Sequence, residues 1–165
     1  MYFSVRLKYK KYLKSKIIRA NGQNVKVVLK DSAGQERYKA ITKPLYRNAK
    51  GVILVCDITN KQSVQDLPKW EEEALVNGPV GMQFVVVANK CDLASGNSGF
   101  ESLAKEWAEK KNYAFFITSA KTQKNLEAAF NTIIKLVVQN TPEMTTDGHQ
   151  SFKISPTRKG NDCCS

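Results

Sequence analysis

The sequence predicts an α/β protein with three layers, in which helices cover both faces of an open, mostly parallel sheet. Three near-continuous apolar runs at 51–58, 82–88 and 113–120 carry this prediction, because strands buried on both faces have that composition. Helical apolar spacing between the runs supplies the crossovers of a parallel sheet. We expect one domain over residues 1–139 and a flexible tail over 140–165, where periodicity is lost.

A β-hairpin is expected at the N-terminal end of this domain. Asn21-Gly22 is a strong signal for a two-residue turn, and the stretch QNVKVVLK follows as the second arm. The segment MYFSVRLKYK at residues 1–10 is too charged for a strand buried on both faces. We therefore expect it to lengthen a hairpin arm and not to enter the middle of the sheet.

Three helices are expected, over 63–76 with a break or kink at Pro68, over 100–111 and over 125–139. Their apolar residues recur at helical spacing and are predicted to be core. They are Val64, Leu67, Trp70, Ala74, Leu75, Phe100, Leu103, Ala104, Trp107, Leu126, Phe130, Ile133 and Val137.

The composition, 42% hydrophobic and 25% charged, is that of a globular domain. No apolar run approaches the roughly 18–20 residues of a membrane span, and the N-terminus lacks the apolar region of a secretory signal. Four cysteines, two of them adjacent near the end, do not form a disulfide framework. These features favour a reducing compartment, the cytosol.

Basic residues are concentrated at the N-terminal end. Residues 1–50 hold 14 Lys and Arg against 2 Asp and Glu, whereas residues 51–165 hold 12 against 13. The excess is consistent with solvated lysines that protect a sheet edge, or with a patch for an anionic membrane or nucleic acid. No aromatic-basic RNA motif or DNA-reading helix accompanies it, so no nucleic-acid partner is expected.

Polar motifs follow three of the predicted strands, at the edge where open α/β sheets bind ligands. They are DSAGQER from Asp31, NKCD from Asn89 and TSAK from Thr118. Each alone is weak, since a lone Asp-x-x-Gly is usually a turn and Asn-Lys is usually an exposed loop. All three in order, each at a strand tip, indicate one binding site.

These motifs resemble those of the Ras-like small GTPases, whose pattern is DTAGQER, NKxD and a third base-binding loop. RYKAIT at 37–42 and LYRNA at 45–49 are similar to the switch signatures of the Rab group. The resemblance implies a monomeric switch in vesicle traffic that binds GTP or GDP with Mg²⁺. It also implies effectors and regulators at a second switch, about residues 33–46, and a place on the cytoplasmic face of intracellular membranes with a cytosolic pool.

The resemblance implies roles in recognising guanine for two of the motifs. Asp92 would accept hydrogen bonds from the guanine N1–H and exocyclic amine, which adenine cannot offer as a pair. Asn89 would brace the loop and reach the base, and Lys90 would lay its aliphatic stem along the purine face. The Ala120 amide would meet the guanine carbonyl, in a loop shaped by Ser119 and Lys121.

The first motif is implied to serve the phosphate end. Asp31 would hold Mg²⁺ through water, and the Gly34 amide would contact the γ-phosphate. Gln35 would orient the attacking water as the catalytic residue.

The phosphate-binding loop G-x-x-x-x-G-K-[ST] of this family does not occur in the sequence, because none of the nine glycines precedes a lysine. Lys8 stands where the resemblance places a Mg²⁺-binding threonine. Losing about five charge-assisted bonds of roughly 1.5–3 kcal/mol each would remove most of a nanomolar affinity, about 12 kcal/mol. We expect weak or absent GTP hydrolysis, with the first strand and first helix of the fold missing.

Two origins fit this pattern: a truncated or mis-predicted gene product, or a degenerate pseudo-GTPase. The alternative function is a nucleotide-independent, membrane-anchored binding module.

The chain ends Asp162-Cys163-Cys164-Ser165, which is not a CaaX box because the cysteine four from the end is missing. The adjacent Cys163 and Cys164 are similar to the double-cysteine prenylation signal of the Rab group, and two lipids give stable anchoring where one is marginal. Two incidental exposed cysteines are the alternative. A metal site is not expected there, since His149 is alone in the tail.

Overall fold

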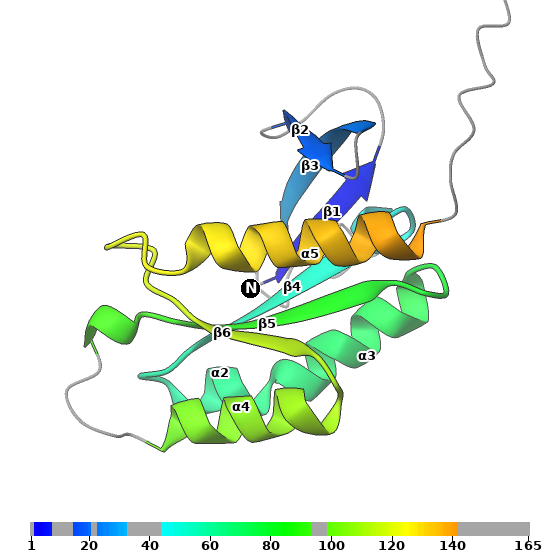
Figure 1. The fold of residues 1–165 in the computed structure, drawn as a ribbon. Coiled ribbons are helices and arrows are strands. Elements are labelled where there is room, and N and C mark those ends of the chain that lie inside the picture. The colour runs from blue at the N-terminus through cyan, green and yellow to red at the C-terminus, as the bar shows by residue number, and fades with distance from the viewer. Residues whose placement is uncertain (1, 8–14, 21–22, 33–43, 94–98, 142–165) are drawn as a thin grey trace, which may run out of the picture.

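The computed structural model describes residues 2–7, 15–20, 23–32, 44–93 and 99–141 (Figure 1). Within them lies one six-stranded sheet in the order β2-β3-β1-β4-β5-β6. The strands are β1 Tyr2–Leu7, β2 Ser15–Ala20, β3 Gln23–Ser32, β4 Gly51–Asp57, β5 Gln83–Asn89 and β6 Ala114–Ile117. The helices are α2 Lys61–Gln65, α3 Leu67–Asn77, the short 3₁₀ turn η2 Cys91–Leu93, α4 Phe100–Lys110 and α5 Leu126–Asn140.

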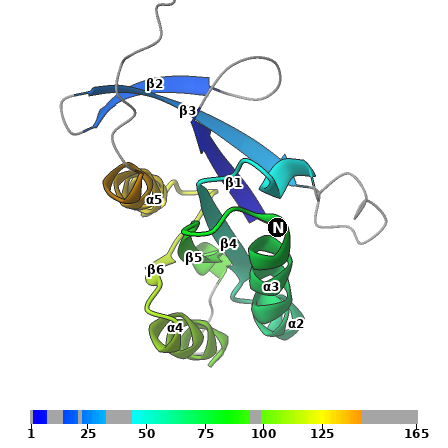
Figure 2. The ribbon, with the colours of Figure 1, turned by 90° about the vertical axis from the view of Figure 1, so that its right-hand side faces the viewer.

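The strands β4, β5 and β6 are parallel, as the three apolar runs predict. Their register runs from Gly51 opposite Gln83 to Asp57 opposite Asn89, and β6 continues on the far side of β5. Helix α5 covers one face of these strands, and α2, α3 and α4 cover the other (Figures 1 and 2). The three-layer α/β fold class is therefore confirmed, but the sheet is mixed: β4, β5 and β6 are parallel, whereas the pairings of β2 with β3, β3 with β1 and β1 with β4 are antiparallel.

The prediction for the N-terminal segment is wrong. Strand β1 lies in the middle of the sheet, between β3 and β4, and is antiparallel to both. Val5 is opposite Leu29 on one side and Gly51 on the other. The charged residues do not keep this segment out of the sheet, because Phe3, Val5 and Leu7 alternate with polar residues and a period-two pattern gives the strand one apolar face.

The hairpin prediction is confirmed by the antiparallel pairing of β2 with β3, from Ser15 opposite Val28 to Ala20 opposite Gln23. The turn residues Asn21 and Gly22 lie outside the described residues. In Figure 2 the hairpin projects beyond the helices at the top of the view. Ile17 on β2 is 67% exposed, so this end of the sheet carries little of the core.

The break predicted near Pro68 is confirmed, because α2 ends at Gln65 and α3 begins at Leu67. Pro68 falls in the first turn of α3, where its missing N–H costs no helical hydrogen bond. Most of the predicted apolar stripes are buried or half-buried, but Leu75 and Leu103 are 54% and 48% exposed. In α4 the small residues Ala104 and Ala108 face the core instead of Leu103.

Helix α5 and β4 approach closely at Gly51. A Cβ atom there would lie 2.8 Å from Val137 and 2.9 Å from Ile133, closer than real Cβ atoms come. Only glycine therefore lets α5 sit this near to β4. Ile133 and Val137 are fully buried in the core between α5 and the sheet.

A polar link joins α3 to the segment between α4 and β6. Glu71 is 4% exposed and accepts a hydrogen bond of 2.6 Å from the Tyr113 hydroxyl. Its other oxygen lies 2.9 Å from Lys111 Nζ. The buried carboxylate is thus satisfied on both oxygens, as a buried charge requires.

None of the described helices is long and apolar enough to cross a membrane.

Candidate functional site

The candidate site lies at the carboxyl edge of β4, β5 and β6, because parallel strands end at one edge (Figure 1). Asp57 ends β4 and is paired in register with Asn89, which ends β5. The segment after β6 begins with Thr118 and Ser119, both 0% exposed. The NKCD and TSAK motifs, 29 residues apart in the chain, are therefore neighbours in space.

Asn89 joins the two motifs. Its Oδ1 accepts a hydrogen bond of 3.0 Å from the Ala120 amide and one of 3.2 Å from Thr118 Oγ1. The Thr118 backbone adds two bonds, donating to Ala88 O at 2.8 Å and accepting from the Cys91 amide at 3.0 Å. Asn89 thus braces the loop. A carbonyl ligand at the Ala120 amide would have to share that N–H with Asn89.

Asp92 and Ser119 make a second link across the same gap. Ser119 Oγ donates to Asp92 Oδ1 at 2.5 Å and accepts from the Thr122 amide at 3.1 Å. The hydroxyl is buried, whereas Asp92 is exposed. A carboxylate has about four acceptor positions, so Asp92 can accept further donors from a ligand while Ser119 holds it in place.

Asp57 and Lys90 form an ion pair at this edge, with 2.6 Å between Lys90 Nζ and Asp57 Oδ2. Thr59 donates to the other oxygen, Oδ1, from its amide at 2.8 Å and from its hydroxyl at 2.6 Å. Burial alone would raise the pKa of Asp57, but the hydrogen bonds from Lys90 and Thr59 outweigh it and lower that pKa. Asp57 is therefore charged near neutral pH.

The family model described as "Ras family" matches residues 8–139. The chain belongs to the Ras family. It is 31% identical over 151 residues to "Ras-related protein Rab-13" of Mesocricetus auratus, covering 90% of this chain and 74% of that protein. It is 34% identical over 155 residues to "Ras-related protein Rab-10" of Diplobatis ommata, covering 92% and 77%. "Ras-related protein Rab11A" of Lotus japonicus is 37% identical over 140 residues, covering 84% and 62%.

The chain is thus a small GTPase of the Rab type within the Ras family. The fold of this Rab-type chain brings together five of the residues predicted to contact guanine, Asn89, Lys90, Asp92, Ser119 and Ala120. Lys121 is exposed beside them. Their role in binding guanine stays a prediction.

Asp31 does not reach this edge with its backbone, which is level with the middle of β4, four residues before Asp57. It lies in β3, where its backbone is opposite Phe3 of β1, and Phe3 is also opposite Ile53 of β4. Gly34, Gln35, most of the switch at 33–46, and the lipidation candidates Cys163 and Cys164 lie outside the described residues. Their predicted roles therefore stay predictions.

Asp57 and Asn125 of this Rab-type site were not predicted from the sequence, and Thr118 was named only as the start of the TSAK motif, without a role. Asp57 carried a signal, because it is the one charged residue near the end of the apolar run at 51–58. Asn125 carried none: it adopts a positive φ of 56° and donates from Nδ2 to Ile117 O at 2.9 Å, which helps to close the loop after β6.

The acceptor oxygens at this edge are held by hydrogen bonds within the protein. Buried Ser119 and Thr118 fix Asp92 and Asn89, so the acceptor oxygens are held before a ligand arrives. Among the described residues, no group of three or more His, Cys, Asp and Glu could hold a metal ion. The predicted contact to Mg²⁺ is through the Asp31 side chain, which is not described.

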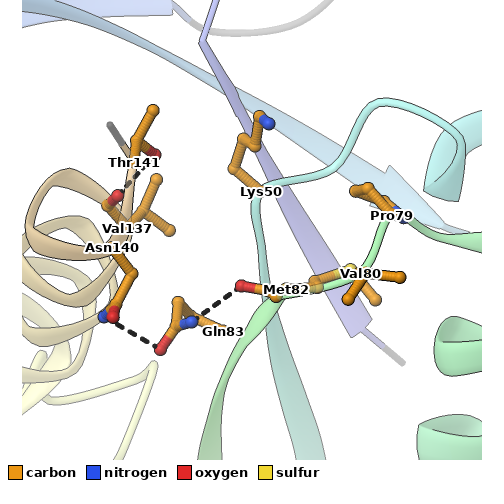
Figure 3. A pocket seen from close by; sticks show the side chains of 9 residues that line it. Lys50, Pro79, Val80, Met82, Gln83, Val137, Asn140 and Thr141 are labelled. Atoms are coloured by element: carbon orange, nitrogen blue, oxygen red, sulfur yellow. Dashed lines mark hydrogen bonds between the residues drawn. The ribbon is translucent and has the colours of Figure 1, made fainter. Parts of the chain in front are cut away.

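A small hollow lies at the opposite edge of the sheet, between the start of β5 and the end of α5 (Figure 3). Its volume is about 120 Å³, below the several hundred Å³ of small-molecule pockets. Gln83, which lines it, donates to Gly81 O at 2.7 Å and accepts from Asn140 Nδ2 at 3.3 Å. Because both ends of this amide are occupied, the hollow offers a ligand little, and the carboxyl edge remains the candidate site.

Proposed function

We propose that this Rab-type chain binds the base of guanine nucleotides but holds their phosphates weakly, so that GTP hydrolysis is weak or absent. Its role would be that of a small GTPase of vesicle traffic in truncated or degenerate form. The base would be held by Asn89, Lys90, Asp92 and the Ser119–Lys121 loop. GTP or GDP with Mg²⁺ would be the ligands that the family implies.

The direction of β1 is the observation that carries this proposal. In the family a phosphate-binding loop follows the first strand and meets the ligand at the carboxyl edge of the sheet. Here β1 occupies the central position but runs antiparallel to β4, with Tyr2 opposite Leu54 and Val5 opposite Gly51. Leu7, the last residue of β1, is therefore directed to the edge opposite Asn89.

The energetic consequence follows from the number of contacts. A backbone loop and its lysine supply charge-assisted hydrogen bonds worth roughly 1.5–3 kcal/mol each. Without them the remaining contacts are those to the base and ribose, and each adds about 0.5–1.5 kcal/mol net. We expect affinities in the micromolar range or weaker, about 8 kcal/mol at most.

The membrane and partner roles are part of the same proposal. Prenylation of Cys163 and Cys164 would anchor the chain on the cytoplasmic face of intracellular membranes, with a cytosolic pool. Effectors and regulators would meet the second switch, about residues 33–46. The chain would act as a monomer.

A second candidate function is a nucleotide-independent, membrane-anchored binding module. The orientation of β1 favours it too, because a chain that cannot grip the γ-phosphate cannot order its switches by it. Partner binding that is equal with and without guanine nucleotide would support this candidate. Partner binding that requires GTP would exclude it.

Titration calorimetry with guanosine, GDP and GTP, each with and without Mg²⁺, tests the main proposal. We expect the three ligands to bind within about tenfold of each other, a difference of 1.4 kcal/mol, because the phosphates add little. Nanomolar, Mg²⁺-dependent binding of GTP would overturn the proposal. So would turnover at the rate of an intact relative that Gln35→Leu abolishes.

Asp92→Asn is the matched test of the base pocket. The amide replaces one acceptor oxygen with a donor, so the preferred base should change from guanine, with its 2-amino group, to xanthine, with its 2-oxo group. Asp66→Asn serves as a control, since Asp66 lies outside the site at the junction of α2 and α3. Unchanged preference in Asp92→Asn would contradict guanine binding by this loop.

A further inference from the structure

We infer that Asp57 is a positioning residue that holds the Lys90 side chain in place for the face of the purine. The inference rests on the proposed binding of guanine at this edge. Asp57 belongs to none of the three motifs and reaches the site from the end of β4, whereas Lys90 follows β5. Asp57 would thus fix the position of the Lys90 side chain, which makes one of the proposed contacts to the base, before the base binds.

The backbone at Lys90 is the first observation. Its φ of +68° is in the left-handed region, which a lysine seldom adopts and which costs free energy. Hydrogen bonds on both sides enforce this conformation: Asn89 O accepts from the Ile58 amide at 3.1 Å, and Lys90 O accepts from the Leu93 amide at 2.9 Å. The turn lets the side chain of Lys90 reach the neighbouring strand at Asp57.

The rigidity of Asp57 is the second observation. Thr59 occupies Oδ1 with two hydrogen bonds, which leaves Oδ2 for the ammonium of Lys90 at 2.6 Å. The Asp57 backbone is also held, because its amide donates to Ser63 Oγ at 2.9 Å and its carbonyl accepts from that hydroxyl at 3.0 Å. The carboxylate side chain is 21% exposed, so it is an anchored acceptor and not a freely moving surface group.

The benefit to the ligand is one of conformational entropy. A free lysine side chain loses rotamer entropy when it is fixed against a base, and that loss weakens binding. The ion pair restricts Lys90 before the ligand arrives, while its aliphatic stem stays accessible, since the side chain is 51% exposed. A preorganised stem strengthens binding without any new contact to the ligand.

This mechanism predicts a distinctive pattern of selectivity. A methylene stem on the purine face does not distinguish one purine from another, whereas Asp92 reads the exocyclic amine. Loss of Asp57 should therefore weaken guanosine and inosine by the same factor. Loss of Asp92 should change the ratio between them, because inosine lacks the 2-amino group.

The experiment measures the affinities of guanosine and inosine for the full chain and for Asp57→Asn, Lys90→Met and the double variant. Asp57→Asn should weaken both nucleosides about two- to fivefold, the range expected for a partly exposed ion pair. In the Lys90→Met background, which keeps the stem but not the charge, Asp57→Asn should have no further effect. Asp66→Asn is the control and should leave both affinities unchanged.

A spectroscopic measurement separates a positioning role from a structural one. The NMR signal of the Lys90 ammonium should shift in Asp57→Asn, while the amide signals of Ala120 and Asp92 should not. The inference is overturned if Asp57→Asn leaves both affinities unchanged, or if it changes the ratio of the guanosine affinity to the inosine affinity. It is also overturned if Asp57→Asn weakens binding by the same factor in the Lys90→Met background as in the unaltered chain. If the unaltered chain binds neither nucleoside, the proposed function fails and the positioning role fails with it, even if the ammonium signal shifts.

Discussion

In the part of the sheet formed by β4, β5 and β6, all strands run in one direction and their polar ends meet at one edge. In the part formed by β1, β2 and β3, each strand is antiparallel to its neighbour. The first part builds a network at Asn89, Asp92, Thr118 and Ser119, whereas the second directs the end of β1 away from it. The order of the strands alone is thus not sufficient for a nucleotide site, because strand direction decides which loops reach the ligand.

The direction of β1 can be tested by an all-or-none cross-link. Leu7 is opposite Val27 in the antiparallel register, so Leu7→Cys with Val27→Cys should form a disulfide. In a parallel register centred on Val5, Phe3 would be opposite Val27 instead. Phe3→Cys with Val27→Cys should therefore not cross-link, since four residues along a strand span about 13 Å. The pairs are compared by mass spectrometry, with Cys163 and Cys164 replaced by serine, and the reverse result would refute the observed β1 direction.

The contribution of the two parts to stability can be compared with one substitution in each. Ile133→Ala removes a fully buried side chain between α5 and the parallel strands and should lower the free energy of unfolding by about 2–5 kcal/mol. Ile17→Ala on β2, where the side chain is 67% exposed, should change it by about 0.5 kcal/mol or less. Urea denaturation measures both, and similar losses would show that the hairpin belongs to the same core.

The network at the carboxyl edge should respond to the loss of its central amide. Asn89→Ala removes the acceptor for Ala120 N and Thr118 Oγ1, and Thr118 is 0% exposed. An unsatisfied buried group costs about 1–3 kcal/mol, so stability should fall by that amount. Hydrogen exchange at the Ala120 amide should become faster. Unchanged exchange there would contradict the bracing role of Asn89, with Asn77→Ala on α3 as a control away from the site.

A smaller effect on stability is expected at alkaline pH from the hydrogen bond between Glu71 of α3 and Tyr113, which lies between α4 and β6. Burial, and then the hydrogen bond to Glu71 and its charge, raise the pKa of Tyr113 above its ordinary value of 10.0. The folded state favours the neutral hydroxyl of Tyr113, and this contribution to stability is complete below pH 10, the ordinary pKa. It is lost as the pH rises above 10, where the unfolded chain ionises first. The free energy of unfolding should therefore decline above about pH 10, more steeply than in Tyr113→Phe. Equal slopes in the two proteins would contradict this assignment.

Much of the parallel part could be predicted from the sequence. Near-continuous apolar runs such as GVILVCDI and QFVVVAN indicate strands buried on both faces, and a polar motif after each run locates the site. Leu75 and Leu103 were assigned to the core and are exposed, whereas the neighbouring Ala74 and Ala104 are buried. Helical spacing predicts which face of a helix is apolar, but it can miss the most buried position on that face by one residue.

The sequence by itself determined the fold class, the family motifs NKCD and TSAK, and the lack of a glycine-lysine pair for phosphates. Only the tertiary structure decided the place and direction of β1, because an alternating pattern reads the same from either end of a strand. It also decided the pairing of Asp57 with Lys90, two residues from different strands whose contact depends on the register of β4 with β5 and on one left-handed turn.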